Sequence, residues 1–137
     1  MMIVVLDTNI FVSGIHWTGS SRKILDLWLS KRIIVVTSLQ IIEEVMRVLT
    51  NFKITLHKKD LLLWESVIFE KTHIVVPTEK VDIIRDDPDD NKFIEAALEA
   101  KAKYIISQDK HLLVVQEYRD IKIVHPDEFM GLMEAML

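Results

Sequence analysis

Acidic side chains follow two stretches of the chain that are predicted to be buried β-strands. Asp7 comes directly after the apolar run Met2–Leu6, and Asp109 comes two residues after the run Tyr104–Ser107. In α/β proteins, binding sites form at the edge of the sheet where the carboxyl ends of the strands meet. We therefore expect the carboxylates of Asp7 and Asp109 to lie close to one another.

Two further groups of acids lie where they could join this edge. The run Asp86–Asp90 leads into a predicted helix that begins near Asn91. An aspartate at that position can cap the helix or project into the same crevice. Glu43 and Glu44 lie in another predicted helix, beside its apolar stripe, and helical geometry alone does not separate the two.

Several carboxylates in one cleft raise one another's pKa and must be neutralised. Oxygen ligands suit hard cations such as Mg²⁺ and Mn²⁺. Such a cation lowers the pKa of a bound water and offsets charge on the transition state of phosphodiester hydrolysis. The chain has no cysteine, which excludes disulfides and thiolate ligands, and it has no zincin histidine pair or glycine-rich phosphate loop. The acids thus favour phosphodiester chemistry over the alternatives that need those groups.

Each acid also has a purely structural interpretation. An aspartate after a strand is often a turn former, as Asp7 could be. Asp109 could cap the short segment Lys110–Val115. Most of Asp86–Asp90 could be a solvated loop with one helix cap, and the two glutamates could belong to a solvated helix face. The residue types alone leave these alternatives open.

The elements that must position the acids alternate along the chain. Strands rich in Ile and Val are predicted at Met2–Leu6, Ile33–Thr37, Ile74–Val76, Tyr104–Ser107 and Ile121–Val124. Helices with apolar residues three to four positions apart are predicted at Ser21–Lys31, Leu39–Thr50, Lys58–Lys71 and Asn91–Lys103, with a last helix opening at Pro126. Continuous apolar strands favour a mostly parallel sheet that is covered on both faces. We expect a three-layer α/β/α fold.

Length and composition are consistent with one ordinary globular domain. The chain has 137 residues, of which 50% are hydrophobic and 28% charged, and we expect residues 1–137 to form a single domain. The longest apolar run, Met1–Leu6, is far shorter than the roughly 20 residues that span a bilayer. It is also too short for a signal peptide, so we expect a cytoplasmic protein. The net charge of −4 means that a nucleic-acid substrate would need a local basic patch or bound cations.

Four motifs, taken in order, resemble those of the PIN-domain ribonucleases, and specifically the VapC-like toxins of bacterial and archaeal toxin–antitoxin pairs. The resemblance covers nearly the whole chain. Its motifs are Val5–Ile10, Ser38 with Glu44 six positions later, Asp87–Phe93 followed by Ala97 and Leu98, and Ile106–Leu112. The tail Ile121–Pro126 is similar to one branch of the family. No single motif is specific, but the four together at these separations are.

The resemblance implies a PIN-like fold and a catalytic and metal-binding set of four acids. These are Asp7, Glu44, Asp90 and Asp109. They would hold one or two Mg²⁺ or Mn²⁺ ions, and a metal-activated water would attack the scissile phosphate of single-stranded RNA. Asn9 and Ser107 would support the site through hydrogen bonds to a ligand carboxylate or a bound water. No organic cofactor is implied.

Several residues are candidates for contacts with RNA or with partner chains. Possible RNA contacts are Arg22, Lys23, Lys92 and Lys110, each of which could equally be an ordinary solvated charge. His16 and Trp17 are expected in a loop after the first strand, where they could stack on a base or meet a partner chain. The resemblance implies a homodimer and a cognate antitoxin, and no membrane. The helix Lys58–Lys71 could offer apolar surface for either contact, but we expect it to feed the core.

Three rival classes share some of these features. A receiver-like signalling domain also holds Mg²⁺ between strand-end acids, but it needs an aspartate after the middle strand, where this chain has Val76–Thr78. A haloacid-dehalogenase phosphatase would need an aspartate at the position of Asn9. A non-catalytic RNA- or partner-binding PIN-like domain is disfavoured by the complete acidic set, although the sequence does not exclude it.

Overall fold

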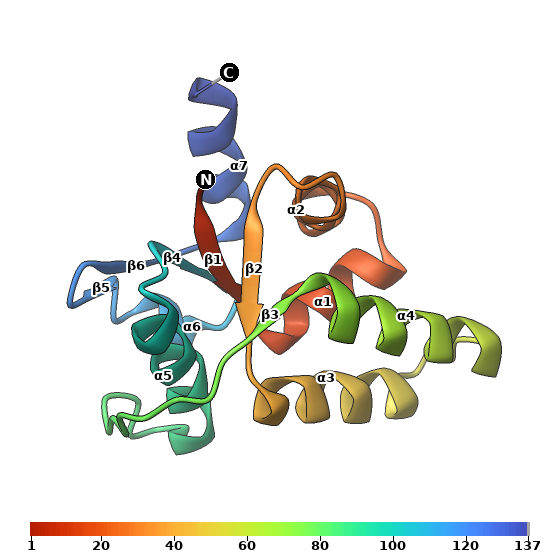
Figure 1. The fold of residues 1–137 in the computed structure, drawn as a ribbon, viewed down its shortest axis with the longest axis horizontal. Helices are drawn as coiled ribbons and strands as arrows, with labels where there is room; N and C mark the ends of the chain where they lie inside the picture. The colour runs from red at the N-terminus through yellow and green to blue at the C-terminus, as the bar shows by residue number, and fades with distance from the viewer. Residues whose placement is uncertain (137) are drawn as a thin grey trace.

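A six-stranded sheet runs through the centre of the molecule (Figure 1). The structure is a computed structural model, and it describes residues 1–136. In sheet order the strands are β3 (His73–Ile74), β2 (Ile34–Thr37), β1 (Ile3–Leu6), β4 (Tyr104–Ile106), β6 (Ile121–Val124) and β5 (Glu117–Tyr118). All neighbouring strands are parallel except β5 and β6. The prediction of a mostly parallel sheet is confirmed.

Helices cover both faces of this sheet. They are α1 (Thr8–His16), α2 (Ser20–Leu29), α3 (Leu39–Asn51), α4 (Lys58–Lys71), α5 (Asn91–Ala100), α6 (Lys110–Leu113) and α7 (Pro126–Ala135), with a 3₁₀ turn η1 at Pro88–Asp90. In Figure 1, α1 to α4 lie to one side of the strands and α5 and α6 to the other, while α7 packs against α2. This is the expected three-layer α/β/α arrangement. None of the helices in residues 1–136 is long and apolar enough to span a membrane.

The order of the strands reverses beside β1. From β1 the chain moves outward to β2 and β3, and α5 then brings it back to β4 on the opposite side of β1. Such a reversal opens a crevice beyond the carboxyl ends of the two central strands. Leu6 of β1 pairs with Ile106 of β4, so residues just beyond these positions lie next to each other. The sheet therefore directs Asp7 and the segment that follows β4 to one place.

Helix α1 is the longest element that the sequence analysis missed. The expectation of a loop around His16 and Trp17 is wrong, because His16 ends α1 and Trp17 caps its carboxyl end. The Asp7 side chain caps the other end by accepting a hydrogen bond from the backbone N–H of Ile10 at 3.1 Å. The apolar residues of α1 follow β1 closely and obscure the change from strand to helix. The capping aspartate was the signal that could have revealed it.

Helix α4 matches the predicted bounds, and one side of it packs against the core as expected. The side chains partly buried there are Leu61, Trp64 and Val67. Only Ile68 of this helix is buried. Leu62, Leu63 and Phe69 are 53%, 60% and 44% exposed. An outer face of α4 therefore presents large apolar side chains to solvent.

Smaller differences concern the ends of elements. Helices predicted to reach Lys31 and Lys103 end at Leu29 and Ala100, because Lys31 and Lys101 adopt left-handed conformations with φ of 65° and 55°. Strand β3 is two residues long and begins one residue earlier than predicted. The short edge strand β5 had no counterpart in the prediction.

Candidate active site

The backbone hydrogen bonds between β1 and β4 continue as far as Asp7. The backbone N–H of Asp7 donates to the carbonyl of Ile106 at 3.1 Å. The Asp7 carboxyl then turns inward and is only 3% exposed. Burial raises its pKa to about 6, with a further rise from the charge of Asp109, while hydrogen bonds from Ser107 and Ile10 oppose the shift. Asp7 is thus a desolvated carboxyl that favours a proton or a cation beside it.

Ser107 connects the first and fourth acids. Its hydroxyl is fully buried and donates to Oδ2 of Asp7, and it also accepts a hydrogen bond of 2.9 Å from the backbone N–H of Asp109. Asp109 in turn caps α6 by accepting from the N–H of His111 at 2.8 Å. One hydroxyl therefore holds both strand-end acids, as the supporting role expected of Ser107 would require.

Asp90 comes from η1, at the start of α5. It is 8% exposed, and its Oδ2 is the only buried carboxylate oxygen in residues 1–136 that has no hydrogen-bond partner. Burial raises the pKa of Asp90 to about 8, and the neighbouring carboxyl of Asp109 and the charge of Asp87 add to the rise. A buried oxygen without a donor is costly unless a proton or a cation neutralises it.

The structure separates the two adjacent glutamates of α3. Glu43 is exposed, whereas the Glu44 side chain is only 16% exposed and faces the other acids. Thr8 donates to Oε1 of Glu44, and Nζ of Lys92 lies 2.5 Å from its Oε2. Arg47 adds a longer contact of 3.9 Å. Glu44 is therefore held by protein donors on both oxygens.

Lys92 is the basic group inside this cluster. Its side chain is 4% exposed and its ammonium also lies 2.7 Å from Oδ2 of Asp89. Burial opposes the charge, but the hydrogen bonds and charges of Asp89 and Glu44 outweigh it and raise the pKa of Lys92. The ammonium is thus engaged by two carboxylates, a position that favours neutralising Glu44 over binding a phosphate.

The four acids line one small cavity of about 80 Å³. Its lining residues are Asp7, Thr8, Asn9, Glu44, Val48, Asp90, Phe93 and Asp109. They come from four separate segments of the chain, and the fold brings all four acids together. Asn9 also lines the cavity, although it is exposed and its side chain makes no hydrogen bond recorded among residues 1–136.

The basic residues expected to contact RNA differ in whether their side chains are engaged by the protein. Arg22 donates to the carbonyls of Gly14 and Ile15, at 2.5 and 3.1 Å, and so closes the carboxyl end of α1. Lys23 and Lys110 are exposed. Arg22 is exposed too, but its donors are engaged by backbone carbonyls, whereas the two lysines make no side-chain hydrogen bond or ion pair within residues 1–136.

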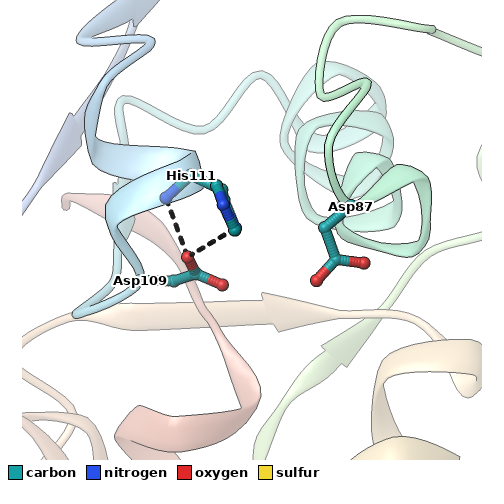
Figure 2. A group of neighbouring side chains, drawn as sticks. All are labelled: Asp87, Asp109 and His111. Carbon is teal, nitrogen blue, oxygen red and sulfur yellow. Dashed lines mark hydrogen bonds and ion pairs between the residues drawn. The ribbon is translucent and has the colours of Figure 1, made fainter.

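The sequence analysis missed three residues near the acids. Thr8 holds Glu44, and its place directly after Asp7 was the available signal. Asp87 and His111 both approach Asp109, as Figure 2 shows. Asp87 was hidden among other acids of its loop, and His111 lies two residues after Asp109 in the sequence.

Asn91 has a structural role that the sequence did not indicate. Its side-chain oxygen accepts from the backbone N–H groups of Ile83 and Ile84, at 3.0 and 2.9 Å. Its amide nitrogen donates to the carbonyls of Ile84 and Pro88, at 3.2 and 2.9 Å. Asn91 therefore fastens the acidic loop to the start of α5 and so helps to position Asp90.

The residues present fit a divalent cation. The donor set consists of carboxylate oxygens, which Mg²⁺ and Mn²⁺ prefer. Asp90 offers a buried oxygen without a donor, and burial and like charge raise the pKa values of Asp7 and Asp90. A cation at this place would relieve both costs.

Comparisons with known proteins agree with the fold. Residues 3–111 match the PIN domain family, and the chain therefore belongs to that family. A relative in Methanocaldococcus jannaschii, the uncharacterized protein MJ1680, is 33% identical over 146 aligned positions that cover 98% of this chain and 93% of the relative.

Solved structures of toxin–antitoxin complexes contain chains with a similar fold. One is VapBC-1 from nontypeable Haemophilus influenzae, with a TM-score of 0.60, 17% identity, and coverage of 92% of this chain and 99% of that chain. Another is VapBC2 from Rickettsia felis bound to a DNA fragment from its promoter, with a TM-score of 0.59, 16% identity, and coverage of 90% and 98%. A third is FitAB bound to the IR36 DNA fragment, with a TM-score of 0.54, 10% identity, and coverage of 90% and 94%.

Proposed function

We propose that residues 1–137 form one PIN-like nuclease domain that cleaves single-stranded RNA with the help of Mg²⁺ or Mn²⁺. The observation that carries this proposal is the convergence of four acids, Asp7, Glu44, Asp90 and Asp109, on one cavity at the switch point of the sheet. Membership of the PIN domain family supports the same conclusion.

Asp7, Asp90 and Asp109 would hold the ion, because their carboxyls are the least compensated by basic side chains. When bound, the ion supplies Lewis acidity and lowers the pKa of a water at the scissile phosphate. Glu44, held in place by Thr8 and Lys92, would offer the ion a further carboxylate oxygen. Ser107 would hold Asp7 and Asp109 at a fixed separation, because its hydroxyl bonds to the carboxylate of one and the backbone N–H of the other.

The small size of the cavity also limits which part of a substrate can reach the acids. Its volume of about 80 Å³ is too small for a nucleotide, so only a phosphate edge could reach the acids. The exposed Lys23 and Lys110 would then contact flanking phosphates of the strand. An unpaired strand can bend into such a narrow opening more readily than a duplex can.

A ribonuclease assay with a matched pair of variants tests the proposal. Purified protein should cut unstructured RNA when Mn²⁺ is added and leave it intact in EDTA. We expect Asp7→Asn and Glu44→Gln to lower the rate at least about a hundredfold, since each removes a charge from the ion's surroundings. Glu43→Gln changes the neighbouring, exposed acid of the same helix and should cut like the parent.

Three results would contradict this assignment. Equal rates for Asp7→Asn and the parent would mean that the activity is a contaminant or that the site is wrong. Equal losses in Glu43→Gln and Glu44→Gln would remove the special role of Glu44. Binding of RNA without cleavage, at any metal concentration, would favour a non-catalytic RNA-binding member of the family.

We further propose that the chain is the toxin of a toxin–antitoxin pair. The support is that the similar solved chains come from VapBC and FitAB assemblies. Induced expression should then arrest growth, and the Asp7→Asn variant should relieve the arrest. A short neighbouring reading frame that restores growth when co-expressed would identify the antitoxin, whereas growth unaffected by the parent chain would favour a role in RNA processing.

A further inference from the structure

A second group of metal-ligating side chains adjoins the acidic cavity and shares Asp109 with it. Asp87 comes from the loop before η1, whereas Asp109 and His111 come from the start of α6. One ligand atom from each of the three lies within 4.8 Å of the other two. Figure 2 shows the Asp109 carboxylate beside the His111 ring, with the Asp87 carboxylate facing both from the other side of a gap.

The contacts inside this group are loose enough for an ion to enter. Nδ1 of His111 lies 3.5 Å from Oδ1 of Asp109, longer than an ordinary hydrogen bond. Among residues 1–136, no lysine or arginine lies within 4.0 Å of either Asp87 or Asp109. The two carboxylates thus face each other and an imidazole without a basic side chain between them.

The buried acid next to Asp109 also points to a bound cation. Asp90 is 8% exposed, and its buried Oδ2 has no donor in the described part of the chain. The side chains of Asp90 and Asp109 lie against each other, and both line the cavity. Asp109 is therefore shared between the buried Asp90 and the outer pair of Asp87 and His111.

Asp7 and Glu44 accept more hydrogen bonds from the protein than Asp90 does. Asp7 accepts hydrogen bonds from Ser107 and from the N–H of Ile10. Glu44 accepts from Thr8 and from Lys92. Asp90, which lies against Asp109, is thus the acid whose buried oxygen still lacks a donor within residues 1–136.

We propose that Asp87, Asp109 and His111, with Asp90 behind them, form a cation site that prefers Mn²⁺ to Mg²⁺. Imidazole suits borderline transition metals, whereas Mg²⁺ favours oxygen ligands and retains its waters. The site shares Asp90 and Asp109 with the proposed nuclease centre. It therefore deepens the proposed function by naming a histidine ligand and the metal that this ligand selects.

Mn²⁺ binding to the full-length chain tests this site without RNA. Pulsed electron paramagnetic resonance of bound Mn²⁺ should show coupling to a nitrogen nucleus in the parent protein. The coupling should disappear in His111→Ala and persist in His57→Ala, which changes an exposed histidine whose side chain caps no helix. His111→Gln, which keeps the length of the side chain, serves as the second variant should the alanine variant fold poorly.

Titration calorimetry gives the matching affinities. The Kd for Mn²⁺ should rise at least about tenfold in His111→Ala, while the Kd for Mg²⁺ should change much less. Asp87→Asn should weaken Mn²⁺ binding, and the adjacent exposed Asp86→Asn should not. Nitrogen coupling that persists in both His111 variants, or a Kd for Mn²⁺ that they leave unchanged, would overturn the proposal.

These results are separable from the test of the nuclease. Mn²⁺-dependent RNA cleavage without nitrogen coupling in the parent would overturn this site and leave the proposed function standing. Nitrogen coupling that depends on His111, in a protein that cuts no RNA, would support this site and overturn the proposed function.

Discussion

At the scale of single residues, the candidate site is defined by how its negative charges are compensated. Lys92 neutralises Glu44, and Ser107 donates to Asp7, but Asp90 keeps a buried oxygen without a donor. The pKa values follow the same order of compensation, with Asp7 raised to about 6 and Asp90 to about 8. These two carboxyls connect protonation, metal binding and stability.

We predict that the metal-free protein loses stability as the pH rises. Both carboxyls start from 3.8, so between about pH 4 and pH 8 the unfolded chain releases protons that the folded chain still holds. The contribution of these two carboxyls to stability is full below about pH 4 and falls until both folded groups have ionised. Since one pKa unit corresponds to about 1.4 kcal/mol and Asp90 has the larger shift, Asp90 should account for most of the loss. Thermal unfolding in EDTA at a series of pH values measures it.

An amide at position 90 provides the control for this prediction. Asp90→Asn has no proton to release, so its stability should depend less on pH between about 6 and 8 than that of the parent. Mn²⁺ binds the ionised carboxylates, and the stabilisation it gives the parent should therefore grow with pH. Parallel pH profiles for the parent and Asp90→Asn would contradict the assigned pKa of Asp90.

At the scale of elements, the site depends on how closely α1 approaches α2. Helix α1 begins at Thr8 with Asp7 as its cap, and it carries one glycine, Gly14, at the contact. A Cβ built on Gly14 would lie 2.6 Å from a side-chain carbon of Leu25 and 2.9 Å from the carbonyl oxygen of Ser21. Only a residue without a side chain fits between these helices.

Gly14→Ala should therefore destabilise the protein by roughly 1 to 3 kcal/mol, because α1 or α2 must shift to admit the methyl group. Gly131→Ala is the matched control, since a Cβ there would have no atom within 4 Å. That change should raise the stability by about 0.5 to 1 kcal/mol, as alanine favours a helix more than glycine does. Urea unfolding measures both. A Gly14→Ala protein as stable as the parent would show that α1 and α2 do not meet so closely.

At the scale of the whole molecule, the exposed apolar face of α4 fits a contact between chains. Leu62 and Phe69 are seven residues apart and share a helix face, and the exposed Leu63 projects about 100° round the helix from Leu62. Adjoining large apolar side chains on a surface mark interaction sites more often than isolated ones do. The homodimer that the sequence resemblance implies is one occupant that would cover this face.

We predict that Leu62→Glu converts a dimer of this chain into a monomer, because a charge at the covered face must be desolvated. Val114→Glu changes a residue that is 75% exposed and lies beyond α6, and it should leave the dimer intact. Light scattering after size exclusion measures the mass of each. A parent chain that is monomeric, or a Leu62→Glu protein that stays dimeric, would contradict a dimer formed through α4.

The sequence alone determined the fold class and which acids were candidates, because both are properties of local pattern. Apolar runs predicted the parallel strands, and a residue that follows a strand end, such as Asp7 or Asp109, must lie at the edge of the sheet. Periodicity did not identify α1. It assigned α4 to the core, although only one side of α4 packs there and its outer side exposes large apolar residues. A pattern reports which side chains are apolar, not which of them find a partner to cover them.

Only the tertiary structure decided how the acids relate to one another. The exposure of Glu43 and the burial of Glu44 depend on which face of α3 meets α1 and α5, which helical spacing leaves undetermined. The same holds for Lys92, whose ammonium lies against Glu44, and for His111, whose ring lies near Asp87 of a separate segment. Charges from distant parts of the chain interact strongly only when folding removes the water between them, so their pairing is a property of the packed molecule.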